Sequence, residues 1–185
     1  DWPTLVRWLR QLPEEQITQH PKLLIIRAWI LNFLWRLDLQ AQVVQQAAEL
    51  LDSEFGARLS AEDQQILRGQ ILMLRAQFAY FSSEFTEAKV LSEKALALLP
   101  ASWTFARGAA ILYLGISMQA NGQIQETERL LLYEYESWSD KTDIYPLIIL
   151  QTLGYVYLWT LQLEKARQIG QVLIQGATRS GILTM

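Results

Sequence analysis

The sequence contains no cysteine and only one histidine. Without cysteine the chain has no disulfide bond, no thiolate metal site and no cysteine nucleophile. His20 has no second histidine with which to share a metal ion, and a serine–histidine–acid triad would depend on this imidazole alone, directly before Pro21. We therefore assign His20 to a turn, and we expect the chain not to be an enzyme and to hold no metal or cofactor.

Clustered positive charge is also missing. The 16 Lys and Arg residues are outnumbered by 19 Asp and Glu residues, which gives a formal net charge of −3. Phosphate backbones bind to basic patches, so we do not expect this segment to bind nucleic acid directly. The sequence has neither the Gly-x-x-x-x-Gly-Lys-Ser/Thr cradle of nucleotide-binding proteins nor a basic recognition helix.

Glycine and proline are scarce, with 9 and 5 residues, and 51% of the chain is hydrophobic. This composition excludes disordered and collagen-like chains and favours one packed domain or one short helical-repeat array. The stretch 144–163 has no charge and the length of a membrane span, but it contains Pro146, Gln151 and Thr160. We expect it to be a buried helix and expect no membrane partner. Because the chain starts at Asp1 and has no basic-then-apolar leader, we expect it to be a piece of a longer protein.

The spacing of apolar residues predicts an all-α fold. Apolar residues recur at i, i+3, i+4 and i+7 almost throughout, and no long stretch alternates with period two. Expected helices cover residues 2–11, 14–18, 21–36, 39–55, 61–83, 86–99, 103–120, 123–138, 145–161 and 164–180. Ser60 with Asp63 is typical of a helix N-cap, and Asn121-Gly122 and Pro100 of helix ends.

Small residues recur in the middle of four of these helices. Ala76, Gly115 and Gly154 are spaced by 39 residues, and Ala28 lies 48 residues before Ala76. Nine residues after each small residue comes an apolar residue that should begin the next helix: Leu37, Phe85, Ile124 and Leu163. A small residue lets a neighbouring helix approach closely, so this pattern predicts about four stacked helical hairpins, an α-solenoid. An irregular helical bundle is the alternative.

The second unit resembles a tetratricopeptide repeat. Ala76, Ala88, Ala95 and Pro100 have the separations of that repeat, although the 39-residue period exceeds its usual length of about 34. The longer period is similar to the repeats of MalT-like regulators, which are ATP-dependent transcription activators of the LuxR type. The segment 5–15 (LVRWLRQLPEE), followed by 20–24 (HPKLL) and Ala28-Trp29, also resembles the region that leads into that array. We therefore assign residues 1–20 to an N-terminal helical lead-in and 21–185 to a MalT-like tetratricopeptide-repeat region.

The resemblance implies a function for the whole family. Such regulators combine an N-terminal nucleotide-binding module, a helical-repeat sensor and a C-terminal helix-turn-helix. The expected function is therefore that of a sensor and protein-interaction region in a cytoplasmic transcription regulator, active in signal transduction, which binds an effector or partner in a concave groove. The alternative is a tetratricopeptide docking scaffold attached to a kinase, a cyclase or another signalling protein. We also expect self-association, because the cut ends of a solenoid leave apolar surface.

In the tetratricopeptide register, three rows of side chains would face the groove. They mix aromatic rings with neutral amides, which suits a neutral polyol or a peptide helix better than an anion. The alternative is that these rows only pack against the neighbouring turn. The candidate contact residues are Trp29, Asn32, Met73, Gln77, Tyr80, Gln119, Gln151 and Tyr155.

Charged residues could form other sites. Arg27 and Arg75 occupy the same place in consecutive units, as do Arg68 and Arg107, and a ladder of guanidinium groups could bind an anion. The alternative is that these arginines tie one hairpin to the next through acids or helix C-termini. The acidic residues between 126 and 143 are expected to form a solvated ridge rather than a metal or catalytic site.

Overall fold

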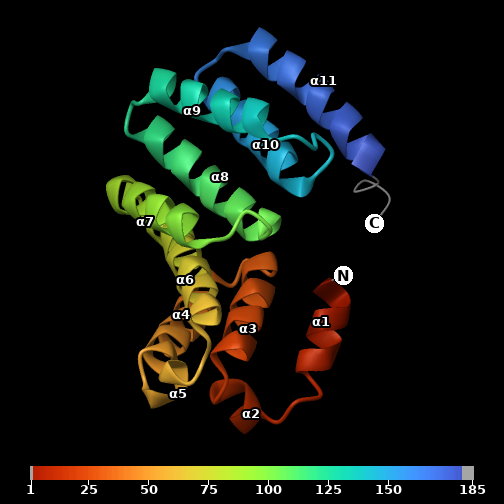
Figure 1. Cartoon of the computed structure of the whole chain (residues 1–185). Helices are drawn as coiled ribbons and strands as arrows, with labels where there is room; N and C mark the ends of the chain where they lie inside the picture. Colours follow the sequence, from red (N-terminus) through yellow and green to blue (C-terminus); the bar gives the residue numbers. More distant parts are fainter. Residues whose placement is uncertain (1, 181–185) are drawn as a thin grey trace.

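The computed structural model describes residues 2–180, which form eleven α-helices and no β-strand. The prediction of an all-α chain is therefore confirmed. The helices are α1 (Trp2–Leu9), α2 (Glu14–Thr18), α3 (Pro21–Phe33), α4 (Leu37–Leu51), α5 (Glu54–Ala57), α6 (Ala61–Phe81), α7 (Phe85–Leu98), α8 (Thr104–Ala120), α9 (Ile124–Ser137), α10 (Ile144–Trp159) and α11 (Leu163–Ser180). Figure 1 shows them following one another in a curved row, with α1 beside α3.

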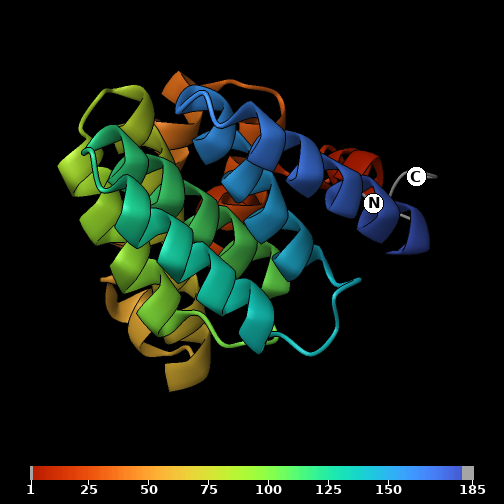
Figure 2. The ribbon, with the colours of Figure 1, turned by 90° about the horizontal axis from the view of Figure 1, so that it is seen from above.

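The long helices pack in consecutive pairs: α3 with α4, α6 with α7, α8 with α9, and α10 with α11. The first helix of each pair also packs on the first helix of the next pair, so that α3 contacts α6, α6 contacts α8 and α8 contacts α10. The second helices α4, α7 and α9 contact the first helix of the following pair. The row of helices is bent. Its two ends, α1 and the C-terminal end of α11, lie on the same side of the molecule in both views (Figures 1 and 2).

The turns inside the four pairs share one backbone geometry. A residue with positive φ follows each first helix: Trp35 (55°), Ser83 (64°), Gly122 (78°) and Leu161 (59°). The next backbone N–H donates to the carbonyl five residues earlier, at 2.8–2.9 Å, in the pairs Arg36–Leu31, Glu84–Ala79, Gln123–Met118 and Gln162–Tyr157. These are the bonds of a Schellman helix end. They recur with the same spacing as the small residues found in the sequence.

Most predicted helix boundaries agree with the structure to within a few residues. Each second helix begins at its predicted apolar residue: Leu37, Phe85, Ile124 and Leu163. The Ser60 cap is confirmed, because its hydroxyl accepts a hydrogen bond from the backbone N–H of Asp63 at 3.0 Å. The helix expected over 39–55 is the exception: α4 ends at Leu51, and Ser53 caps the separate short helix α5 by accepting from the N–H of Phe55.

Small residues allow α8 and α10 to pack closely. A Cβ atom at Gly108 would lie 2.4 Å from Ile148, and one at Gly115 would lie 2.6 Å from Thr152. Ala28 and Ala76 are fully buried at the equivalent places of α3 and α6. In the last pair Gly154 is only half-buried, and a Cβ there would meet no atom closer than 4.0 Å. The space around Gly154 in α10 is therefore less closely packed than the space around Ala28, Ala76 and Gly115.

The charge-free segment forms α10, whose residues from Tyr145 to Leu150 are all buried. It is the inner helix between α8 and α11, as its contacts with both show. The expectation of a buried helix is therefore confirmed. Across residues 2–180, none of the helices combines the length and the apolar character that crossing a membrane requires.

Candidate binding surface

Helices α3, α6, α8 and α10 carry the eight predicted contact residues. Six of them are partly exposed: Trp29, Asn32, Tyr80, Gln119, Gln151 and Tyr155. The other two belong to the interior, since Met73 is 0% exposed and Gln77 is 2% exposed. We therefore leave Met73 and Gln77 out of the surface that a ligand can touch.

Met73 and Gln77 are buried because neighbouring side chains cover one face of α6. Gln70, which lies one turn before Met73 on the same face, accepts a hydrogen bond from the indole N–H of Trp29 at 2.9 Å. The side chain of Gln77 donates to Asn32 at 2.5 Å and accepts from buried Gln40 at 3.0 Å. The polar atoms of Trp29 and Asn32 thus bind α6, and the two α6 residues Met73 and Gln77 are packed between helices instead of lining a groove.

Three aromatic rings meet above this face and form the first cluster of the surface. Trp29 lies 5.1 Å from Phe105 of α8 and 6.4 Å from Phe33, measured between ring centroids, and Phe33 lies 6.0 Å from Phe105. Phe33 and Phe105 are each 43% exposed. We call these three residues the Trp29 cluster.

A hollow of about 250 Å³ lies beside the Trp29 cluster, between α3 and the first half of α6. Its walls include Trp29, Trp103, Gln70 and the apolar Ile25 and Ile66. Lys22 and Asp63 also line it and form an ion pair at 2.7 Å. The hollow therefore offers two indole faces, one amide and a neutralised ion pair, a combination that suits an uncharged amphipathic group.

Three tyrosines from three helices form a second cluster. The ring of Tyr80 lies 6.0 Å from that of Tyr113, and Tyr80 and Tyr155 both pack against the hydrophobic cluster that contains the buried Tyr113. Burial is the main cause that raises the pKa of Tyr113 above its ordinary value, while a hydrogen bond with Gln77 lowers it. The hydroxyl is therefore a neutral hydrogen-bonding group over the physiological pH range.

Tyr155 links the second cluster to the last pair of helices. Its ring stacks on Trp159 with the centroids 5.5 Å apart and the planes inclined by 13°. Its hydroxyl accepts a hydrogen bond from the side-chain amide of Gln151 at 3.0 Å. Tyr80, Tyr113 and Tyr155 are called the tyrosine cluster below.

The four arginines have partners within the fold and do not form an anion-binding ladder. Arg27 binds Glu14 through two hydrogen bonds, and the side chain of Arg68 pairs with Asp52 at 2.7 Å. Arg107 donates to the carbonyl groups of Leu96 and Leu99 at the C-terminal end of α7. Three of the four arginines thus tie elements together through acids or a helix end, as the alternative interpretation states.

Several acidic side chains of α9 also have structural partners. Glu128 accepts from Lys165 at 2.7 Å and from the hydroxyl of Tyr157 at 2.8 Å, and Glu134 accepts from the hydroxyl of Tyr145 at 2.8 Å. Lys165 and Tyr157 lower the pKa of Glu128 below its ordinary value. Within residues 2–180, no three His, Asp or Glu side chains come together as a metal site requires.

Sequence reasoning missed several residues of this surface, among them Phe33, Phe105, Trp103, Tyr113 and Gln70. None of the register rows includes the first turn of a helix, whereas Phe105 and Trp103 lie at the start of α8 and just before it. They reach the surface because the first turn of α8 approaches α3. No periodicity within one helix encodes that approach, so the sequence held no signal for these contacts.

No protein-family model matches the chain, and the search of solved structures finds no significant match.

Proposed function

We propose that the chain is an α-solenoid of four tetratricopeptide-like hairpins behind a short helical lead-in formed by α1 and α2. The hairpins are α3–α4, α6–α7, α8–α9 and α10–α11. The four equivalent Schellman turns support this proposal, because their spacing follows the small-residue repeat. The packing of each first helix on the next is also what a stacked array requires.

The function that this surface supports best is that of a sensor and protein-interaction region in a cytoplasmic, MalT-like regulator of the LuxR type. The carrying observation is that partly exposed aromatic rings and amides from different helix pairs gather at two places, in the Trp29 cluster and around the buried ring of Tyr113. Rings and neutral amides recognise an amphipathic uncharged effector or an apolar segment of a partner. ATP binding and DNA binding would belong to other domains of a longer protein.

The same contacts suggest how binding would act on the fold. Trp29 belongs to the first hairpin and Phe105 to the third, so a ligand inserted between their rings would alter the bend of the row. A ligand shifts such an equilibrium only by its difference in affinity for the two arrangements. Binding at the Trp29 cluster would therefore favour one curvature of the array and so one activity state of the parent regulator.

Isothermal titration tests the sensor function. The protein is titrated with a panel of uncharged metabolites that includes oligosaccharides, and a saturable isotherm is expected for at least one of them. Trp29→Ala should weaken that binding at least tenfold, whereas Tyr133→Ala, which removes a 69% exposed ring from α9, should leave it unchanged. The absence of binding across the panel would refute a small-molecule sensor.

The second candidate function is a protein-docking scaffold attached to a kinase, a cyclase or another signalling protein. It is favoured by the exposed area of the rings around the hollow, because Trp103 is 40% exposed and Phe33 and Phe105 are each 43% exposed. Exposed aromatic groups are typical of the anchors of protein interfaces. The coding sequence on both sides of this chain separates the two functions: a phosphate-binding loop upstream and a helix-turn-helix downstream are expected for the regulator.

Self-association is also proposed. The last pair has an apolar hollow of about 280 Å³, lined by residues such as Leu147, Leu173 and Ile174, and Ile174 is 62% exposed. Exposed apolar area of this kind promotes association. Sedimentation velocity over a hundredfold range of concentration should show a rising mean mass. A constant monomer mass would contradict the proposal.

A further inference from the structure

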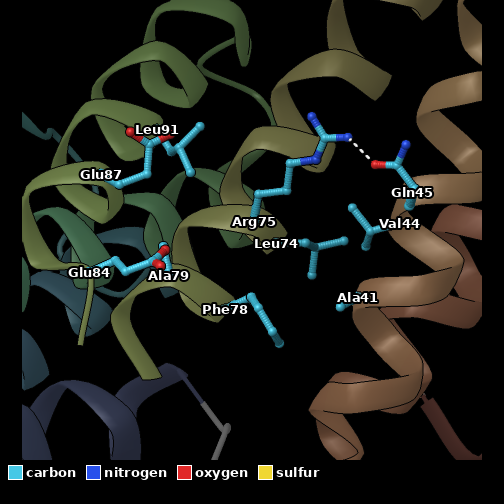
Figure 3. Close-up of a pocket in the computed structure, with 10 residues that line it drawn as sticks. All are labelled: Ala41, Val44, Gln45, Leu74, Arg75, Phe78, Ala79, Glu84, Glu87 and Leu91. Atoms are coloured by element: carbon cyan, nitrogen blue, oxygen red, sulfur yellow. Dashed lines mark hydrogen bonds between the residues drawn. The ribbon is translucent and has the colours of Figure 1, made fainter. Parts of the chain in front are cut away.

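A groove runs along a different face of α6, between α4 and α7. It consists of two hollows of about 250 and 210 Å³, both of which Gln45 and Arg75 line. Figure 3 shows the larger one, with the guanidinium of Arg75 directed to the amide of Gln45. The hydrogen bond between them, at 2.9 Å, therefore stands at the junction of the two hollows.

The floor of the larger hollow is apolar. Val44 and Leu74 are almost fully buried beneath it, with 2% and 1% of their surface exposed. Phe78 forms one wall and is 42% exposed, and Ala41 leaves open space along α4 because its side chain is small. A volume of 250 Å³ over such a floor can accept one large apolar side chain.

The rim of the larger hollow is acidic on the α7 side. Glu84 and Glu87 are exposed and line the hollow, and the carboxylate of neither forms an ion pair or a hydrogen bond within residues 2–180. Figure 3 places both on the side of the hollow opposite Gln45. On the α4 side, Asp52 pairs with Arg68, whereas Glu49 accepts a hydrogen bond at 2.7 Å only from the neutral amide of Gln45. Arg75, at the junction of the hollows, is bonded to the neutral Gln45 and forms no ion pair with the residues that the structure describes, so it offsets only one of the three unpaired carboxylates. The excess charge of the groove is therefore negative, and two of the three carboxylates lie at the α7 rim.

We propose that this groove binds an amphipathic helix of a partner protein, with one large apolar anchor on Val44 and Leu74 and a basic side chain close to Glu84 and Glu87. A helix is the fitting shape, because the two hollows follow α4, which has 15 residues and so extends for about 22 Å. The free carboxylates select a basic partner and repel nucleic acids and acidic lipid headgroups. The site is separate from the surface formed by the Trp29 and tyrosine clusters, and it does not depend on the function proposed for that surface.

Fluorescence anisotropy with designed peptides tests the proposal on the full chain. The probe is a labelled peptide of about sixteen residues with Leu on one helical face and Lys on both flanks of that face. The controls are the same peptide with Glu in place of Lys, and a peptide of equal composition whose order destroys the amphipathic face. The Lys peptide should bind saturably, and both control peptides should bind at least tenfold more weakly.

Variants of the protein then locate the binding. The double variant Glu84→Gln, Glu87→Gln should bind the Lys peptide about tenfold more weakly. The control double variant Glu93→Gln, Glu126→Gln removes two exposed acids outside the groove and should change the affinity less than twofold. Ala41→Trp fills the hollow without changing any charge and should also weaken binding about tenfold. Circular dichroism confirms that each variant keeps its helices.

The opposite results overturn the proposal. No saturable binding of the Lys peptide would do so, as would equal affinity for the Lys and Glu peptides, or unchanged affinity in both groove variants. Trp29→Ala should leave peptide binding intact. Loss of binding in that variant, with no loss in the groove variants, would move the peptide to the Trp29 cluster and refute the groove as its site.

Discussion

Trp29 of α3 and Phe105 of α8 stand 5.1 Å apart between ring centroids, and the face of α6 that carries Met73 is buried in the same region. This contact joins the first hairpin to the third, which are not consecutive in the chain. Each indole or phenyl ring has apolar area on both sides, so the pair can cover the interior while part of its ring area stays exposed. The covering role can be tested without knowledge of the ligand.

Phe105→Ala should destabilise the fold by about 1–2 kcal/mol, less than the loss for a fully buried phenylalanine, because 43% of the ring is exposed. Urea unfolding followed by circular dichroism measures the change. The substitution should also speed the oxidation of Met73 by peroxide, read by mass spectrometry against Met118, which lies 7% exposed in the other part of the core. An unchanged ratio of the two oxidation rates would show that the Trp29 cluster does not shield α6.

The buried amides next to this contact give a second test. Gln77 accepts from Gln40 and donates to Asn32, while the carbonyl oxygen of Gln40 is buried without a hydrogen-bond partner among the described residues. Gln77→Leu should cost about 2 kcal/mol, because it leaves the amide of Gln40 with no partner at all. Adding Gln40→Leu should recover at least half of that loss in a double-mutant cycle. A double variant as unstable as the sum of the two single variants would contradict this.

The sequence predicted the parts of this fold that depend on local chemistry. Leu37, Phe85, Ile124 and Leu163 begin their helices as expected, because an apolar residue at a fixed distance after a helix end is needed to close each hairpin. A small residue such as Gly115 also marks a place where a neighbouring helix comes close. Short-range spacing is enough for both inferences.

The contact surface was less predictable because it depends on how the helices cross. Met73 and Gln77 stand in the register rows, yet both are buried, and Gln77 is bonded to Asn32 of α3 and Gln40 of α4. Phe105 stands outside the rows and still reaches the surface. The short helix α5 was also missed, because Phe55 and Ala57 continue the apolar pattern of α4 although the chain changes direction at Ser53. The crossing angle of two helices depends on the side chains of both helices. The local spacing of residues along one sequence therefore says little about crossing angles or chain reversals.

The positive-φ residues of two equivalent turns, Leu161 and Gly122, should respond to substitution with opposite changes in stability. Leu161 has a φ of 59° and is 81% exposed, so Leu161→Gly should stabilise the fold by about 0.5–1 kcal/mol, because glycine adopts positive φ without the steric cost of a Cβ. Gly122→Ala should destabilise the fold by a similar amount. A Cβ at Gly122 would meet no atom within 4 Å, so only its φ of 78° opposes alanine. Thermal unfolding measures the change in stability of each variant. Changes of the same sign in both variants would contradict the shared turn geometry.

The docking of α11 should depend on pH through Glu128. None of the α11 residues is buried, and its lysine Lys165 is held by the carboxylate of Glu128, which also binds Tyr157 of α10. These partners lower the pKa of Glu128, so its stabilising contribution is complete above the ordinary carboxyl pKa and is lost as the pH falls through the lowered value. Hydrogen exchange in α11 should therefore lose protection between about pH 5 and pH 3, relative to α7.

In Glu128→Gln the carboxylate is absent at every pH, so the protection of α11 should already be reduced at pH 7 and should fall less on acidification. An equally steep loss in that variant would mean that another acid controls the contact between α11 and α9. Glu164 is the internal comparison. Arg167, in the same helix, lowers the pKa of Glu164 to about 2, and this pair does not connect α11 to its neighbours.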